Sequence, residues 1–288
     1  MSSGFGLDSP AVAHMGTAPA VDPLQAGWAA LRDFFRQGRG ALTRAIELLQ
    51  AAEAGVRRSG EPTRMTLWLL ALATALRYTR NPESLDEALE RARELVNLVA
   101  RAQDEAATIP YRTVVEGIYC DHADVVPAQA VASVAAGLQY SDRTVRLARR
   151  VGRDDWLAAA LASRGDLMLR HAGTDRRGIR RALTLHEEAR RRWPARDREG
   201  RAQAGLGYAA ALLAAGEASK AELVARESLA AFAGCGDRYH EAGAHLMLAR
   251  VLLALQRDDA LDEQAAAASL FKILGCRWEL GQAERVLA

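Results

Sequence analysis

Three aspartates, Asp258, Asp259 and Asp262, have the spacing DDxxD, which could hold a metal ion. Carboxylate oxygens are hard ligands, so this spacing suits Mg²⁺ together with a diphosphate group. The same residues lie at an expected turn between two helices, where acidic side chains stabilise the start of the following helix. No second metal motif accompanies them, and aromatic residues that could shield a cationic intermediate are sparse. We therefore expect them to cap a helix, and we predict no metal site.

A second pattern combines His240, Glu241 and His245 and superficially matches a zinc-binding HExxH helix. Zinc binding by that motif requires the two histidines at positions i and i+4, which places both on one helix face. Here the second histidine comes one residue too late for that arrangement. We predict ordinary, partly exposed helix residues at these positions.

A third candidate is the cluster Cys120, Asp121, His122 and Asp124. A cysteine and a histidine two residues apart could share a metal ion or form a reactive pair. No recognisable partner motif stands elsewhere, and buried cysteines are usually inert. The sequence therefore predicts no catalytic residue, no metal and no cofactor, while a chemical role for Cys120 and His122 stays open as part of an alternative function.

Arginine is concentrated in the middle of the chain. Residues 142–201 contain 17 Arg against nine Asp or Glu, whereas the whole chain has a formal net charge of only +2. Such a band could steer an acidic peptide or a nucleic acid toward the protein. Aromatic platforms for single-stranded nucleic acid are largely missing, so an acidic protein is the preferred partner. The simpler interpretation is a solvated face with local ion pairs.

Composition indicates an α-helical protein. Half of the 288 residues are hydrophobic, 26% are charged and 6% are aromatic, and alternating runs rich in Val, Ile and Thr are scarce. Three distant cysteines without CxxC spacing favour neither a disulfide scaffold nor a structural zinc site, and they fit a reducing cytoplasm. The apolar runs are too short to span a bilayer, and no Walker-type GxxxxGK[ST] sequence occurs. We expect a cytoplasmic chain whose residues 1–23 form a flexible tail.

Two helical hairpins in tandem over residues 202–272 are the clearest elements that could position a site. Each has a first helix rich in Ala and Leu, a turn at Gly216 or Asp258, and a second helix that stops at glycine. Ser219 and Glu222 have the spacing of a capping box at the start of one second helix. The turns recur about 40 residues apart, and helix pairs at such a period form arrays.

Large and small residues alternate in these hairpins in the order typical of one repeat family. In the first copy the residues are Gly205, Tyr208, Ala209, Leu212 and Ala221, and in the second they are His245, Leu248, Ala249, Leu252 and Leu261. The unit resembles the tetratricopeptide repeat, with glycine in place of a large residue in the first copy and leucine in place of a small one in the second. The resemblance implies a right-handed superhelix whose concave face is lined by the first helix of each pair.

Residues 63–101 carry a more specific likeness. The residues that carry it are Leu72, Ala73, Arg77, Tyr78, Asn81, Pro82, Leu85, Asp86 and Ala88. They resemble the tetratricopeptide variant of bacterial signalling arrays, including those beside CHAT proteases, and the C-terminal repeats resemble those of signal-transduction ATPase regulators. No CHAT-type catalytic sequence and no ATPase module occur with them, so we expect neither activity.

The remaining segments look like looser copies of the same hairpin. Residues 24–37 and 41–57 are expected to form a first pair, and residues 154–192 a later one. Residues 107–152 depart most from the pattern, and there we expect an irregular repeat with a shortened first helix. Residues 278–287 should form a C-terminal capping helix with a polar outer face. That outer face is expected to consist of Glu279, Gln282, Glu284 and Arg285.

The predicted fold is all-α, a right-handed superhelical array of about six hairpins plus a C-terminal capping helix over residues 24–288. We predict a non-catalytic adaptor, scaffold or regulatory module that binds a partner protein or peptide, preferably an acidic one, and neither membrane nor nucleic acid. The residues expected to face its groove are Arg77, Tyr78, Asp166, Arg170, His245 and Arg250. The alternative is a helical-repeat shell, a sensor or biosynthetic enzyme, that encloses a small ligand in an apolar cavity near His122.

Overall fold

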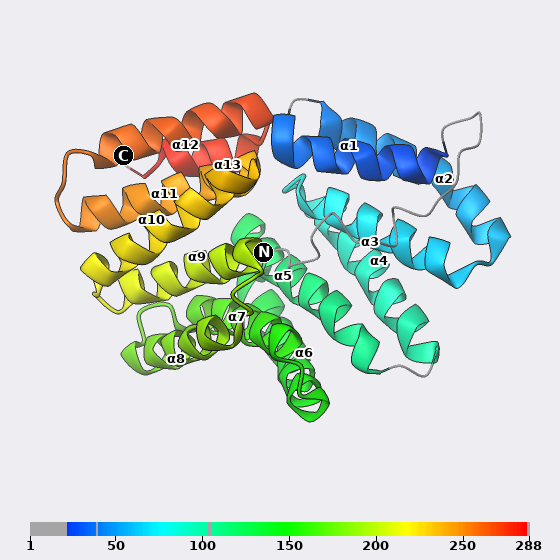
Figure 1. Ribbon diagram of the computed structural model, residues 1–288, viewed down its shortest axis with the longest axis horizontal. Helices are drawn as coiled ribbons and strands as arrows, with labels where there is room; N and C mark the ends of the chain where they lie inside the picture. The colour runs from blue at the N-terminus through cyan, green and yellow to red at the C-terminus, as the bar shows by residue number, and fades with distance from the viewer. Residues whose placement is uncertain (1–21, 39, 103–104, 287–288) are drawn as a thin grey trace.

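The chain folds into a curved array of antiparallel helix pairs, described for residues 22–38, 40–102 and 105–286 by a computed structural model (Figure 1). These residues contain thirteen α-helices, two short 3-10 helices and no strand. The six pairs are α1 (Pro23–Gln37) with α2 (Ala41–Ser59), α3 (Pro62–Arg77) with α4 (Pro82–Arg101), α5 (Ile109–Val125) with α6 (Ala130–Val151), α7 (Asp154–Ala172) with α8 (Arg176–Arg192), α9 (Arg198–Ala214) with α10 (Ala218–Cys235), and α11 (Arg238–Ala254) with α12 (Ala260–Leu274). The last helix, α13 (Arg277–Glu284), packs on α12. The predicted all-α array of hairpins with a terminal helix is confirmed.

Local sequence chemistry sets several of the helix starts. The Asn81 side chain accepts hydrogen bonds from the backbone N–H groups of Glu83 and Ser84, and Pro82 occupies the first position of α4. Proline fits there because the first N–H groups of a helix have no partner within it. Asp175 caps α8 in the same way. These caps place the hairpin turns where the sequence pattern predicts them.

Residues 107–152 are more regular than expected. The 3-10 helix η2 (Ala106–Thr108) leads directly into α5, and Pro110 occupies the first turn of α5, where proline is tolerated. Because α5 has 17 residues, the same length as the first helices α9 and α11, the predicted shortening of the first helix is wrong. A second 3-10 helix, η3 (Pro127–Gln129), joins the two.

Two predictions about helix ends are also wrong. Ser219 does not cap α10, because that helix already begins at Ala218 and its N-cap makes no side-chain hydrogen bond. Glu279 is not part of a polar outer face on α13. It is buried, and its carboxylate accepts a hydrogen bond from the Tyr239 hydroxyl at 2.7 Å.

The aspartates of the DDxxD motif do not cap a helix through their side chains. Asp259 occupies the N-cap position of α12, but its side chain accepts no hydrogen bond from the helix backbone. The carboxylate instead binds the Arg257 guanidinium, with Nε at 3.1 Å and Nη2 at 2.6 Å. Asp259 therefore takes part in an exposed ion pair at the turn, and Asp262 lies in the first turn of α12.

We expected a flexible tail over residues 1–23, and residues 1–21 of it lie outside the described residues. Asp22 and Pro23 are described and already belong to the start of α1, where the Asp22 carboxylate accepts a hydrogen bond from the Leu24 N–H at 3.0 Å. Among the described helices, none is long and apolar enough to cross a lipid bilayer.

The array curves so far that its two ends meet. Figure 1 shows α1 beside the end of α12, and α1 contacts both α11 and α12. Five buried side chains form a closure cluster at this junction: Phe34, Phe35, Tyr78, Tyr239 and His240. The Phe35 and His240 rings stack with centroids 5.8 Å apart, and the Tyr78 and Tyr239 rings meet edge to face at 4.8 Å. Aromatic pairs at these distances stabilise an interface beyond the area they bury.

Gly38 shows how closely the two ends approach. It follows α1 with a φ of 80°, and a Cβ atom at this position would lie 2.7 Å from the Leu274 Cα at the end of α12. Any other residue would strain the left-handed backbone and clash with the opposite end of the array. The superhelix is therefore closed into a ring.

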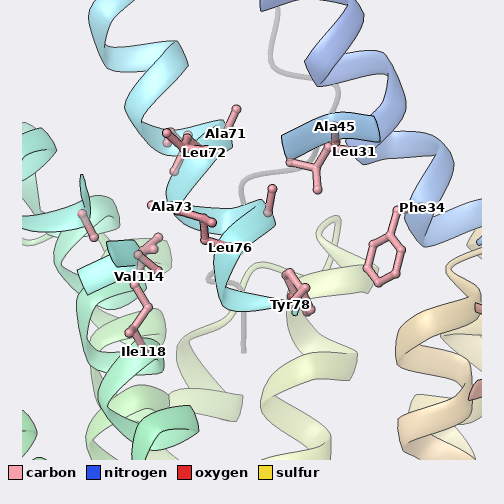
Figure 2. Packing of buried hydrophobic residues seen from close by; sticks show 14 of the residues in the cluster. Leu31, Phe34, Ala45, Ala71, Leu72, Ala73, Leu76, Tyr78, Val114 and Ile118 are labelled. Atoms are coloured by element: carbon pink, nitrogen blue, oxygen red, sulfur yellow. The ribbon is translucent and has the colours of Figure 1, made fainter. Parts of the chain in front are cut away.

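One hydrophobic core runs from α1 through α3 to α5. Figure 2 shows Leu31 on α1, Leu72 and Leu76 on α3, and Val114 and Ile118 on α5 within this core. The first helix of each pair also contacts the first helix of the next pair, and α1 contacts α11. The odd-numbered helices from α1 to α11 thus form an inner wall that closes on itself.

Glu116 is a carboxyl buried in this wall. It lies on α5 near Thr144, Arg112 and Arg164, is 0% exposed, and neither of its carboxyl oxygens has a hydrogen-bond partner among the described residues. Burial raises the pKa of Glu116 to about 8, and the hydroxyl and the two guanidiniums lower it only in part. The side chain is therefore protonated near neutral pH.

This carboxyl should make stability depend on pH. The pKa of Glu116 is near its ordinary value of 4.5 in the unfolded chain and about 8 in the folded chain, so the folded state holds this proton more tightly. The resulting stabilisation is complete at low pH and is lost as the pH rises toward 8. We expect the free energy of unfolding to fall by about 1 kcal/mol between about pH 7 and pH 8. Glu116→Gln should remove this slope in urea unfolding. Equal slopes in the two proteins would contradict the assignment.

Candidate binding site in the inner wall

A polar cavity of about 140 Å³ opens in the inner wall between α5 and α7, beside the turn after α3. We call it the inner cavity. Its lining residues are Arg80, Gly117, Cys120, Asp121, Asp124, Ser163, Asp166 and Arg170. Most of them are carboxylates or guanidiniums, so the cavity suits a charged or hydrogen-bonding group rather than an apolar one.

Helical spacing brings these residues to one surface. The stripe on α5, at positions i, i+3, i+4 and i+7, consists of Gly117, Cys120, Asp121 and Asp124. The stripe on α7, at positions i, i+3 and i+7, consists of Ser163, Asp166 and Arg170. Residues at such spacings share a helix face. Because α5 and α7 are in contact, the two stripes meet at the cavity.

Asp121 anchors one side of the cavity. Its carboxylate accepts a hydrogen bond from the Arg77 Nε–H and forms a second ion pair with Arg80. Burial alone would raise the pKa of Asp121, but the two guanidiniums outweigh it and hold the pKa well below its ordinary value of 3.8. Gly117 makes room for this pairing, since a Cβ there would lie 2.6 Å from the Arg77 guanidinium nitrogens. Asp121 is therefore an ionised partner for two buried arginines.

Arg80 joins the cavity to the ring closure. Its backbone has a left-handed φ of 52° in the turn between α3 and α4. Its Nε donates to Glu279 Oε1 at 3.0 Å, and its guanidinium lies 5.3 Å from the centre of the Trp278 ring. One side chain thus links the second helix pair to the C-terminal helix.

Asp124 and Arg170 form the more accessible side of the cavity. The Arg170 Nε and Nη2 donate to the two Asp124 oxygens at 2.8 Å and 2.6 Å, a bidentate pair. Their side chains remain 31% and 27% exposed, respectively. Arg250 on α11 is exposed and is attracted by the Asp124 carboxylate. A ligand that approaches this side meets the Asp124 carboxylate paired with Arg170, with the positive charge of Arg250 acting from α11.

Asp166 is the buried carboxyl of the cavity. Its Oδ1 lies 3.5 Å from His186 Nε2, and its Oδ2 has no hydrogen-bond partner among the described residues. Burial raises the pKa of Asp166 to about 7, although Arg170 lowers it, and burial with the help of Arg170 lowers the pKa of His186 to about 4. Gly165 and Gly207 leave space for the imidazole, because a Cβ at either would lie 2.6 Å from the ring. Near neutral pH this carboxyl can donate or accept a hydrogen bond.

Cys120 and His122 do not act together. Cys120 lines the cavity, but burial raises the pKa of its thiol to about 12, so the thiol stays protonated and poorly reactive. His122 lies elsewhere, with Nδ1 at 3.0 Å from Ser133 Oγ and Nε2 at 3.2 Å from Asp86 Oδ1. The described residues contain no group of three or more potential metal ligands. His122 does not line the inner cavity, and the apolar small-ligand shell stays a prediction.

The structure brings three of the expected groove residues to one place. Asp166 and Arg170 line the inner cavity, and Arg250 interacts with Asp124 from α11. Three of the other lining residues, Cys120, Asp121 and Asp124, belong to the cluster noted in the sequence, but they were not expected to face the groove. The i, i+3, i+4, i+7 stripe on α5 is the signal that could have placed them with Gly117 on one surface.

The other three expected groove residues lie elsewhere. Arg77 is buried against Asp121, and Tyr78 is buried in the closure cluster, so neither presents its side chain to a partner in this structure. His245 lies between α11 and α12, where its Nδ1 is 2.5 Å from Glu263 Oε2. Packing of α3 against α5 buries Arg77, and the ring closure buries Tyr78.

No protein-family model and no curated protein sequence matches this chain. Among solved structures, a Rap protein complexed with Competence and Sporulation Factor is similar with a TM-score of 0.61 at 13% identity, over 94% of this chain and 75% of that one. A STAND protein with a tetratricopeptide repeat sensor from Pyrococcus horikoshii aligns with a TM-score of 0.49 at 15% identity, over 94% of this chain and 40% of that one. At 13% identity the likeness to the Rap protein shows a shared fold alone, an array of helical hairpins. The likeness to arrays beside CHAT proteases stays a prediction.

Proposed function

We propose that this chain is a protein-interaction module that holds a short segment of a partner protein against its inner wall. The observation that carries the proposal is the inner cavity, a charged recess between α5 and α7 in which a buried Asp166 oxygen has no partner among the described residues. Buried polar atoms are normally paired, so such an atom suits a ligand donor. The Rap protein of similar fold is itself complexed with Competence and Sporulation Factor, which supports a binding role by analogy.

The size and charge of the cavity limit what it can hold. Its volume of about 140 Å³ is well below that of a typical small-molecule site, roughly 300–1,000 Å³. It therefore suits a single side chain or chain end of a longer segment. Arg170 and Arg250 can bind a carboxylate, while Asp124 and Asp166 can accept hydrogen bonds from a donor group. We infer a segment that carries an acidic group and a donor close together.

Loss of the two guanidiniums should weaken this binding. Random-peptide phage display on the wild-type protein supplies ligands without knowledge of the natural partner. We expect Arg170→Ala/Arg250→Ala to lower the affinity for the selected peptides at least about tenfold, because hydrogen bonds to charged groups contribute roughly 1.5–3 kcal/mol each. Fluorescence polarisation measures the affinity, and circular dichroism verifies that the helices remain.

A matched control removes the same charge from the outer helices. Arg143 on α6 and Arg180 on α8 are exposed. The variant Arg143→Ala/Arg180→Ala should bind the selected peptides with unchanged affinity. Wild-type affinity in the Arg170/Arg250 variant, or the same loss in both variants, would contradict the proposed site.

A further inference from the structure

The arginine band of residues 142–201 contributes only Arg170 to the inner cavity. Several other members are neutralised within the fold, since Arg153, Arg164 and Arg192 form ion pairs with nearby aspartates. Three arginines at the end of the band, Arg190, Arg198 and Arg201, line a second recess.

This recess is a groove of about 220 Å³ between α8, α9 and α10, which we call the basic groove. Arg190 borders it near the end of α8, and Arg198 and Arg201 border it from the start of α9. The buried part of its lining is largely apolar and includes Ala202 and Val224, which are 4% and 6% exposed. No residue lines both the basic groove and the inner cavity.

The positive charge of the basic groove is only partly balanced. Arg190 pairs with Glu227 on α10 at 3.0 Å. Arg198 and Arg201 are exposed, and neither has an ion-pair partner within the described part of the chain. Their i, i+3 spacing places both on the same face of α9. Two free guanidiniums therefore stand beside a buried apolar surface.

We propose that the basic groove binds an acidic segment of a partner protein. An apolar side chain of that segment packs on Ala202 and Val224, and flanking carboxylates bind Arg198 and Arg201. A guanidinium presents parallel N–H donors that match the two oxygens of a carboxylate. The proposal uses other residues than the inner cavity, so it does not rest on the function proposed above.

The lining of the groove favours a peptide over other anions. Single-stranded nucleic acid binds through stacked bases, and no aromatic side chain lines this groove. A free phosphate would satisfy the arginines but would leave the apolar lining exposed to water. An acidic peptide with one apolar residue satisfies both parts of the groove.

The test uses the full chain and a fluorescein-labelled peptide in which one valine stands between two runs of glutamate. We expect Arg198→Glu/Arg201→Glu to lower the affinity for this peptide at least about tenfold. Arg180→Glu/Arg181→Glu changes the net charge equally on the exposed face of α8 and should alter the affinity less than about twofold. A loss of affinity in Arg170→Ala/Arg250→Ala as large as that in Arg198→Glu/Arg201→Glu would place the peptide in the inner cavity and would overturn the proposal.

Several results would overturn the proposal. Equal losses in the two charge-reversal variants would indicate general electrostatic attraction instead of a site. Equal affinity for a peptide with glycine in place of valine would remove the role of the apolar lining. Tighter binding of labelled single-stranded DNA would assign the surface to nucleic acid. Absence of peptide binding at about 1 mM would show that the groove does not bind an acidic peptide.

Discussion

Asp121→Asn should lower the free energy of unfolding by about 3–5 kcal/mol near neutral pH, because it removes the ionised partner of the buried Arg77 guanidinium and leaves Arg80 with its ion pair to Glu279. The Arg77 and Arg80 side chains are only 2% and 11% exposed, so water cannot replace the lost partner. The pKa of Asp121 is held well below its ordinary value of 3.8, so its stabilisation is present above that value and is lost as the pH falls below it. The difference in free energy of unfolding between the wild type and Asp121→Asn should therefore be largest at neutral pH and become smaller in acid.

A surface aspartate provides the matched control for this variant. Asp86 contacts His122 at 3.2 Å, but its side chain is 70% exposed. Asp86→Asn should change the free energy of unfolding by less than about 1 kcal/mol. Urea unfolding of the three proteins measures the difference, and a similar small effect in both variants would show that the buried network contributes little.

Phe35→Ala should open the ring and lower the free energy of unfolding by about 3–5 kcal/mol, because it leaves a cavity in the closure cluster. Phe35 is 5% exposed and packs against Tyr78, Tyr239 and His240. The substitution removes aromatic packing that holds the two ends of the array together. Hydrogen exchange should therefore accelerate most in α1, α2 and α13, and least in α7.

An exposed apolar residue on α11 provides the control for ring opening. Leu253 is 46% exposed, so Leu253→Ala should change stability by about 0.5 kcal/mol or less and leave the exchange pattern as in the wild type. Uniform acceleration in all helices of the Phe35 variant would mean that the ends do not separate as a unit.

The helical array could be predicted because its signals are local. The Asn81–Pro82 turn and the stops at Gly216, Gly236 and Gly275 act within a few residues, and all three glycines have positive φ values. Each helix pair needs contacts only with its neighbours, so the repeat pattern determines the order of the elements. The same locality explains why most helix bounds agree within a few residues with the sequence analysis.

The ring closure could not be predicted from that pattern. Arg80 and Glu279 are 199 residues apart in the chain, and no repeat rule relates them. The pattern correctly places Arg77 and Tyr78 near the end of a first helix, but it does not show that Tyr78 is buried by the closing ends of the array. Arg77 pairs with Asp121 across two neighbouring helix pairs, 44 residues along the chain, and the repeat pattern does not determine which side chains pair there. The role of Asp121 was therefore not assigned.

Chemical labelling of carboxyl groups, with and without a phage-selected peptide bound, tests the central claim most directly. Asp124 in the inner cavity and Asp154 on α7 are 31% and 64% exposed, so a carbodiimide with an amine should label both in the free protein. If the peptide occupies the inner cavity, mass spectrometry should find Asp124 protected and Asp154 labelled as before. Unchanged labelling of Asp124 at saturating peptide would show that the ligand binds elsewhere and would contradict the proposed function.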